Sequence, residues 1–110
     1  MTEEESLKLE TEFYELRMPG YILGKEVVDS KARRIGIVRS LRISIPNFKA
    51  ELIIKGLDVE FPVDIENVVA VGSVIQLRNV VKEAEEVEIH DILRLRKEVW
   101  DEIKNYFVRL

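Results

Sequence analysis

The sequence of 110 residues contains no cysteine and a single histidine, His90. The lack of cysteine excludes disulfide bonds, thiolate nucleophiles and the usual zinc or iron–sulfur centres. One histidine cannot build a multi-histidine metal site within one subunit. We therefore expect no metal site and no cofactor.

Long apolar runs are also missing. No stretch approaches the roughly 20 apolar residues that a membrane-spanning helix needs. The chain begins with Met1, Thr2 and three glutamates, whereas secretory signals begin with a basic and then an apolar segment. These features predict a cytoplasmic protein with no segment inserted directly into a membrane.

A concentrated excess of basic charge is absent as well. The 17 Lys and Arg residues are outnumbered by 21 Asp and Glu residues, which gives a formal net charge of −4. Residues 1–20 carry two cations and six anions, residues 21–78 carry nine and seven, and residues 79–110 carry six and eight. The acidity therefore lies at the two ends of the chain. A protein that binds nucleic acid by its charge usually shows the opposite pattern.

Lys31, Arg33 and Arg34 form the one local basic patch that could contact phosphates. Two acidic residues, Glu26 and Asp29, lie close to it, and the neighbouring predicted strands offer no aromatic platform for base stacking. We therefore interpret the basic patch as a solvated hairpin, and we do not expect nucleic acid to be the partner.

The residues that are abundant indicate one folded domain. Hydrophobic residues make up 46% and charged residues 35% of the chain, which is not the composition of a disordered protein. Glutamine occurs once, at Gln76, whereas valine, isoleucine, glutamate, lysine and arginine are frequent. Such a composition is a tendency of proteins from hyperthermophiles, so we expect a thermophile protein.

We predict three regions: a flexible acidic leader over residues 1–12, a β-barrel over 13–90 and a helix over 91–110. Short β-branched segments between turn signals indicate the strands. The predicted strands are 13–18, 21–29, 35–45, 49–55, 59–63 and 74–78. Arg39 interrupts an otherwise apolar strand face, which predicts a β-bulge or a strong coiling of the strand near Arg39 and Ser40. Asp64 is expected to cap one helical turn over residues 65–67. Residues 79–90 fit either a strand or a helix.

The C-terminal segment has the clearest helical pattern. Large apolar residues recur three and four residues apart and form a wide stripe, with Asp91 as the expected N-cap. The stripe holds more large side chains than one short face of a barrel should need. We expect part of it to cover the barrel and the rest to contact a partner or a second copy of the chain. The predicted contact residues are Val99, Trp100, Ile103, Tyr106, Phe107 and Leu110.

Other candidate sites are weak. The acidic cluster between Glu83 and Asp91 lacks the aspartate and glycine spacing of a calcium-binding loop. His90 and Asp91 resemble half of a catalytic dyad, but no serine lies in a nucleophile-elbow context. No glycine-rich phosphate-binding loop is present. We therefore predict no catalytic residues and do not expect an enzyme.

Several short motifs, in order, resemble the PRC-barrel family. They are Leu23-Gly24-Lys25 with Val27 to Ser30, Arg34 to Val38, Phe61-Pro62-Val63 with Ile65, and Val71 to Leu77. The resemblance covers about residues 20–79 and implies a mainly β fold. That fold is a small PRC-type β-barrel of about five to six short strands, followed here by the amphipathic helix. Glycines at positions 24, 36 and 72 fit such a barrel, since glycine permits sharp bends, close backbone approach and positive φ.

The resemblance also implies a function. Members of this family act mostly as adaptors, and the family carries no catalytic motif. Stand-alone archaeal members are similar in size to this chain, and some bind the membrane-anchoring partner of the cell-division ring. We therefore expect a non-catalytic protein–protein interaction module: a homodimeric adaptor in archaeal cell division, recruited to the division site. The alternative is a ribosome-associated or RNA-processing accessory protein that recognises a basic ribosomal protein through its acidic ends.

Overall fold

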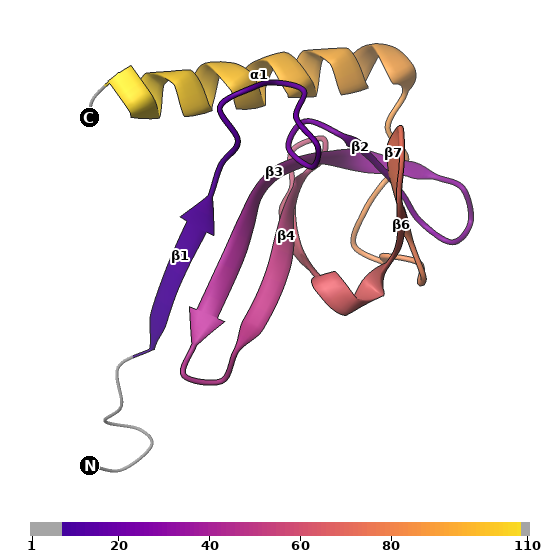
Figure 1. Cartoon of the computed structure of the whole chain (residues 1–110). Coiled ribbons are helices and arrows are strands. Elements are labelled where there is room, and N and C mark those ends of the chain that lie inside the picture. Colours follow the sequence, from indigo (N-terminus) through magenta and orange to yellow (C-terminus); the bar gives the residue numbers. More distant parts are fainter. Residues whose placement is uncertain (1–7, 109–110) are drawn as a thin grey trace.

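The computed structural model describes residues 8–108 and shows a mainly β fold with one long C-terminal helix (Figure 1). Seven strands form one sheet. In chain order the elements are β1 (Leu9–Phe13), β2 (Glu26–Val28), β3 (Arg34–Ile45), β4 (Lys49–Lys55), β5 (Glu60–Asp64), the 3₁₀ turn η2 (Ile65–Asn67), β6 (Val68–Val71), β7 (Val74–Leu77) and α1 (Ile89–Val108).

The sheet is organised around β3, its longest strand. The strand order is β5-β4-β3-β2-β7-β6, and β1 is a further partner of β3. All pairs are antiparallel except β2 with β7. The first part of β3 pairs with β2 and the last part with β1, while β4 runs along the other side. The sheet curls strongly in Figure 1, but within residues 8–108 no pairing of β5 with β6 closes it.

The predicted bulge at Arg39 is confirmed. The register of β3 against β4 shifts between Val38 and Ser40, so Arg39 is an extra residue in the ladder. Val38 pairs with Ile54 and Leu41 with Leu52. Ile54 and Leu52 are two residues apart on β4 and so lie on one face of the sheet. Their partners Val38 and Leu41 therefore lie on that face as well. The extra residue thus restores the apolar face that an uninterrupted alternation would have lost.

One hydrophobic core joins the sheet to α1. Buried residues of β3, β4, β5 and β7 pack with Ile92, Leu95, Val99 and Ile103 of the helix. Residues 79–88 form neither the strand nor the long helix that the sequence left open, and this segment contributes Val81, Ala84 and Val87 to the core. The spacing of three between these residues lets an irregular segment bury one side of its chain.

Other predicted boundaries were wrong. The flexible leader was expected to extend to residue 12, but residues 9–12 belong to β1, because Leu9 and Phe13 pair with Ile45 and Leu41 of β3. Residues 1–7 of that leader lie outside the described residues. No strand extends over residues 14–18 or 21–25, whereas Val68–Val71 is an additional strand.

The predicted ends of two helical segments had different outcomes. The turn at residues 65–67 is confirmed, and the Asp64 carboxylate accepts a hydrogen bond from the Glu66 N–H at 2.8 Å. Asp91 is not the N-cap of α1, because the helix begins at Ile89. Asp91 lies in the first turn instead, where its charge still favours the helix dipole.

Gly36 is the position where glycine is required most strictly. Its φ is +148°, and a Cβ built there would lie 2.3 Å from the Lys55 carbonyl oxygen of β4. Gly24 also has a positive φ, of +79°. Gly72 lies in a turn where positive φ was an open expectation, but its φ is not positive, and a Cβ there would meet nothing within 4 Å.

Candidate interaction surface

The predicted contact residues on α1 separate into two groups. Val99 and Ile103 are buried in the core of the same chain, so they are not available to a partner. The prediction was wrong for these two because α1 needs more of its apolar stripe to cover the sheet than we expected. Trp100 is half-buried, while Tyr106 and Phe107 are exposed. Leu110 lies outside the described residues.

The two exposed aromatic residues of α1 already have a contact within the chain. The ring of Tyr14, in the segment after β1, lies 6.2 Å from that of Tyr106 and 6.5 Å from that of Phe107, centroid to centroid. These are ordinary separations for interacting aromatic rings. The end of the helix is therefore partly occupied by Tyr14, and self-association through Trp100, Tyr106 and Phe107 stays a prediction.

Two of the three residues of the basic patch form ion pairs within the chain. Arg33 forms an ion pair with buried Asp29 at 2.7 Å, and its guanidinium donates hydrogen bonds to the carbonyl oxygens of Val81 and Ala84. Arg34 pairs with Glu26 at 2.8 Å, and Lys31 is exposed. Arg33 thus holds the 79–88 segment against the sheet. This structural role supports the interpretation of the basic patch as a hairpin and not as a phosphate-binding site.

The acidic cluster before α1 is a solvated surface. The side chains of Glu88 and His90 are 77% and 71% exposed. Within residues 8–108, no group of three histidine or acidic side chains is placed to hold a metal ion.

A three-stranded extension of the sheet points away from α1, and we call it the arm (Figure 1). It consists of β1, residues 41–45 of β3 and residues 49–52 of β4, and their register is unbroken. Thr11 pairs with Ile43, which in turn pairs with Ala50, and Phe13 pairs with Leu41, which pairs with Leu52. Because side chains alternate along strands, these residues lie on one face of the arm.

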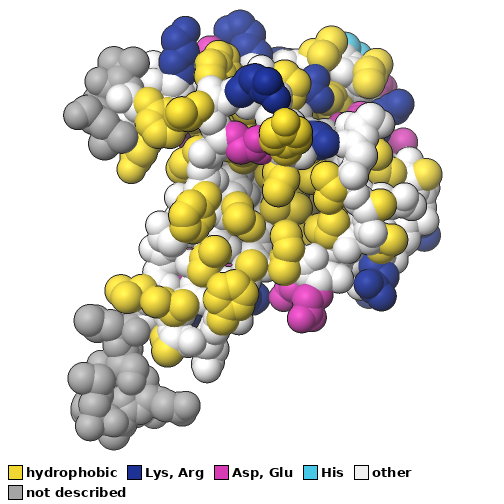
Figure 2. All heavy atoms as spheres, in the orientation of Figure 1, with side chains coloured by type: hydrophobic (Ala, Val, Ile, Leu, Met, Phe, Trp, Pro, Cys, Tyr) yellow, Lys and Arg dark blue, Asp and Glu magenta, His cyan; other side chains and the backbone are white. Residues whose placement is uncertain are grey.

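The outer part of that face is mostly apolar and is exposed, while Leu52 at its inner end is buried. Leu9, Phe13 and Ile45 are 56%, 52% and 42% exposed, and Phe48 at the tip of the β3–β4 hairpin is 73% exposed. The face continues the one that carries core residues Leu52 and Ile54 deeper in the sheet. Figure 2 shows hydrophobic side chains running from the body of the molecule along the arm. This surface was not predicted, because residues 9–12 were expected to belong to a flexible leader and not to a strand.

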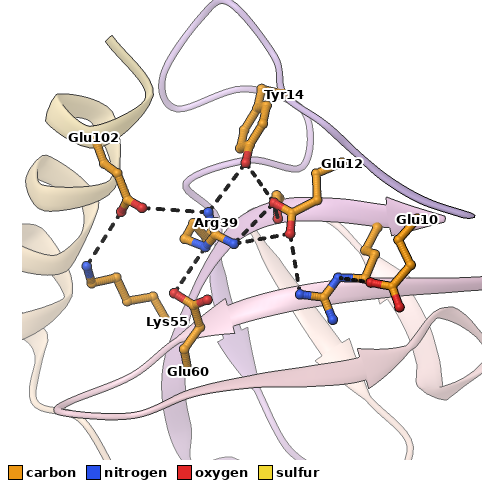
Figure 3. Close-up of polar contacts among 9 residues, drawn as sticks. Glu10, Glu12, Tyr14, Arg39, Lys55, Glu60 and Glu102 are labelled. Atoms are coloured by element: carbon orange, nitrogen blue, oxygen red, sulfur yellow. Dashed lines mark hydrogen bonds and ion pairs between the residues drawn. The ribbon is translucent and has the colours of Figure 1, made fainter. Parts of the chain in front are cut away.

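The opposite face of the arm is polar and is tied to the rest of the molecule through Arg39. The guanidinium of Arg39 lies 3.1 Å from Glu12, 3.0 Å from Glu60 and 3.7 Å from Glu102 (Figure 3). It therefore links β1, β5 and α1 to β3. Arg42 pairs with Glu12 at 3.3 Å and with Glu10 at 3.8 Å. In this cluster Arg39 and Arg42 are shared by four carboxylates, and Lys55 adds a third cation, 3.8 Å from Glu102.

The network fixes the charge states of its members. Burial opposes ionisation of Glu12, but hydrogen bonds from Tyr14 and Ser40 and the charge of Arg39 outweigh it, so the pKa of Glu12 is lowered. Burial likewise opposes the charge of Arg39, and the carboxylates of Glu60 and Glu12 outweigh it and raise the pKa of Arg39. The pKa of Tyr14 is raised by burial and by Glu12. Arg39 and Glu12 therefore form a charged structural pair, with Tyr14 as a neutral donor.

Compared with known proteins, the chain matches no family model and no curated protein. Within residues 8–108, no helix is long and apolar enough to cross a membrane.

A second carboxylate, Glu15, organises the segment between β1 and β2. Its oxygens accept hydrogen bonds from the backbone N–H groups of Tyr21, Ile22 and Leu23 at 2.6–2.7 Å. Burial alone would raise the pKa of Glu15, but these hydrogen bonds outweigh it and lower the pKa. The sequence contains no sign of this role, because no recognisable spacing relates Glu15 to the backbone amides that it binds.

Three lowered carboxyl pKa values predict an acid-sensitive fold. Burial opposes ionisation of Asp29, but hydrogen bonds from Arg33 and Lys31 lower its pKa below 3.8, as the pKa values of Glu12 and Glu15 are lowered below 4.5. A carboxyl whose pKa is lower in the folded state binds protons more readily when unfolded. The stabilisation that these carboxylates contribute should therefore be complete above about pH 5. It should be lost as the pH drops through the lowered pKa values.

Urea unfolding at a series of pH values measures this effect. Asp29→Asn should be less stable than the wild type at pH 7, and its curve should fall less steeply below pH 4, because one titrating group is gone. A wild-type stability that stays constant between about pH 5 and pH 3 would contradict the assignment of these three carboxylates.

Proposed function

We propose that this protein is a non-catalytic protein-interaction module whose curled sheet is a PRC-type β-barrel. The observation that carries the interaction function is the uncovered apolar face of the arm. Monomeric proteins rarely expose contiguous apolar patches beyond a few hundred Å², and larger ones mark interaction sites. Four large side chains on or at the tip of this face are exposed: Leu9, Phe13, Ile45 and Phe48.

The rigid construction of the arm also supports its role as a binding surface. Its strands keep an unbroken register, and Glu12, Arg39 and Arg42 anchor its polar face. A surface held in one geometry before binding loses less conformational entropy when a partner docks. The favoured process is archaeal cell division, and the family resemblance of residues 20–79 is its support.

A capture experiment with a matched control tests this proposal. Tagged wild-type protein is incubated with extract of the native source and compared with a Phe13→Ser, Phe48→Ser double variant. Both side chains are more than half exposed, so the fold should be retained. We expect the double variant to capture about tenfold less partner or even less than that, because central apolar side chains supply much of the binding energy of an interface. Leu93→Ser, which changes a 61% exposed leucine on α1, should retain it.

The identity of the captured proteins tests the process. Division-ring proteins recovered with or without nuclease would support the adaptor function. Ribosomal proteins that disappear after nuclease treatment would replace it with the ribosome-associated alternative. If the double variant captures the same proteins as the wild type, the arm is not the interaction surface and the proposal fails.

A further inference from the structure

Three strands have a free edge within residues 8–108: β1, β5 and β6. Free edges invite pairing with other chains, and proteins usually protect them. The β5 edge contains Pro62, which lacks an N–H, and the β6 edge is bent by a register shift between Val68 and Ala70. The β1 edge has neither feature. All five residues of β1 pair with β3 without a shift, so its outer side is a regular template for another strand.

The charges on β1 do not protect its edge in the usual way. Glu12 is turned toward Arg39, Arg42 and Ser40, and its side chain is only 24% exposed. Glu10 is 48% exposed, and its cation, Arg42, is 3.8 Å away and shared with Glu12. The polar side of β1 therefore offers one half-exposed carboxylate, Glu10, held by a long ion pair, beside a regular edge.

We propose that the outer edge of β1 accepts an extended strand of a partner protein in which apolar and basic residues alternate. The inference rests on the proposed interaction function and specifies its partner. Main-chain hydrogen bonds to β1 would position the strand. Its apolar side chains would extend the face formed by Leu9 and Phe13, and a basic side chain would meet the half-exposed Glu10.

A second copy of the chain fits this edge poorly. Self-pairing of β1 would place Glu10 and Glu12 of both copies on one face, and like charges on neighbouring strands destabilise a sheet. The whole segment 1–20 carries two cations and six anions, so two such segments repel each other. A basic strand relieves the same excess of negative charge. Charge complementarity therefore favours a different partner at this site.

Synthetic peptides test strand addition directly. The probe is a short fluorescent peptide of alternating valine and lysine, and its binding to the full chain is followed by fluorescence anisotropy. Two further peptides carry N-methyl groups on alternate residues, in the two possible phases. A strand added to an edge uses the N–H of every second residue. One methylated peptide should therefore lose about tenfold or more in affinity, and the other much less.

A charge exchange tests the predicted chemistry. A peptide with glutamate in place of lysine should bind more weakly than the parent. The Glu10→Lys variant changes a half-exposed side chain. It should bind the lysine peptide more weakly and the glutamate peptide more tightly than the wild type does. Equal binding of both peptides would exclude charge recognition at β1. Equal binding of the two methylated peptides and the parent would exclude strand addition.

The outcomes separate this inference from the proposed function. If the Phe13→Ser, Phe48→Ser variant loses its partner but methylation has no effect, the arm is an interaction surface and strand addition is wrong. If that variant keeps every partner, the interaction function itself is wrong. A molar mass that doubles from 12.8 kDa with concentration, and does so more readily in Glu10→Lys, would identify a second copy as the occupant and overturn the choice of partner.

Discussion

Replacement of Gly36 by alanine is expected to destabilise the protein by about 3 kcal/mol or more, a large part of the total for a domain of this size. The new Cβ would lie 2.3 Å from the Lys55 carbonyl oxygen and 2.9 Å from its carbon, so the backbone of β4 has to move. The φ of +148° is also a conformation that alanine rarely adopts. The midpoint of guanidinium chloride unfolding measures the loss.

Gly72→Ala is the matched control for this variant. A Cβ at Gly72 meets no atom within 4 Å and needs no unusual φ. Its effect should stay within about 0.5 kcal/mol, as for most surface substitutions. If both glycine variants were equally stable, the close approach of β3 to β4 at Gly36 would be wrong.

Arg39→Met is expected to cost about 2 to 3 kcal/mol at pH 7. The substitution leaves Glu12, Glu60 and Glu102 without their shared cation, and removing one partner of a buried ion pair is strongly destabilising. We expect less than for a fully buried pair, because Glu60 and Glu102 are 44% and 52% exposed and water screens their charge. Thermal and chemical unfolding of the variant measure the loss.

Two further measurements separate the lost charge from lost packing. Glu60→Gln in the Arg39→Met background should recover part of the stability, because it removes the carboxylate whose ion pair was with Arg39. Arg42→Met, at a side chain that is 29% exposed, should cost about 1 kcal/mol or less. If Arg39→Met and Arg42→Met were equally destabilising, the central position of Arg39 in the network would be contradicted.

The sequence was most informative where a residue breaks a local pattern. Arg39 on an apolar strand face predicted the bulge that the register confirms, and Asp64 before residues 65–67 predicted the 3₁₀ turn. β4 lies at residues 49–55, where it was predicted. Such features depend on neighbours along the chain, so the sequence alone contains the information.

The arm and the Arg39 cluster could not be predicted in the same way. The segment before residue 13 is polar and acidic, and only its pairing with β3 makes Glu10 and Glu12 part of a strand. Arg39 meets residues 12, 60 and 102, and no local rule relates those positions. The helix pattern was correct in type, but periodicity shows only that a stripe is apolar. It does not show how much of the stripe the sheet covers, so the burial of Val99 and Ile103 was missed.

The long sequence separations within the Arg39 cluster have a consequence for folding kinetics. Its carboxylates lie at residues 12, 60 and 102, so the cluster is complete only after β1, β5 and α1 have all been placed beside Arg39. Contacts that form this late contribute little to the transition state, so their energy slows unfolding rather than speeding folding. In stopped-flow experiments Arg39→Met should therefore unfold faster while its folding rate changes little. The cluster would then stabilise the protein kinetically, because slower unfolding lengthens the lifetime of the folded state.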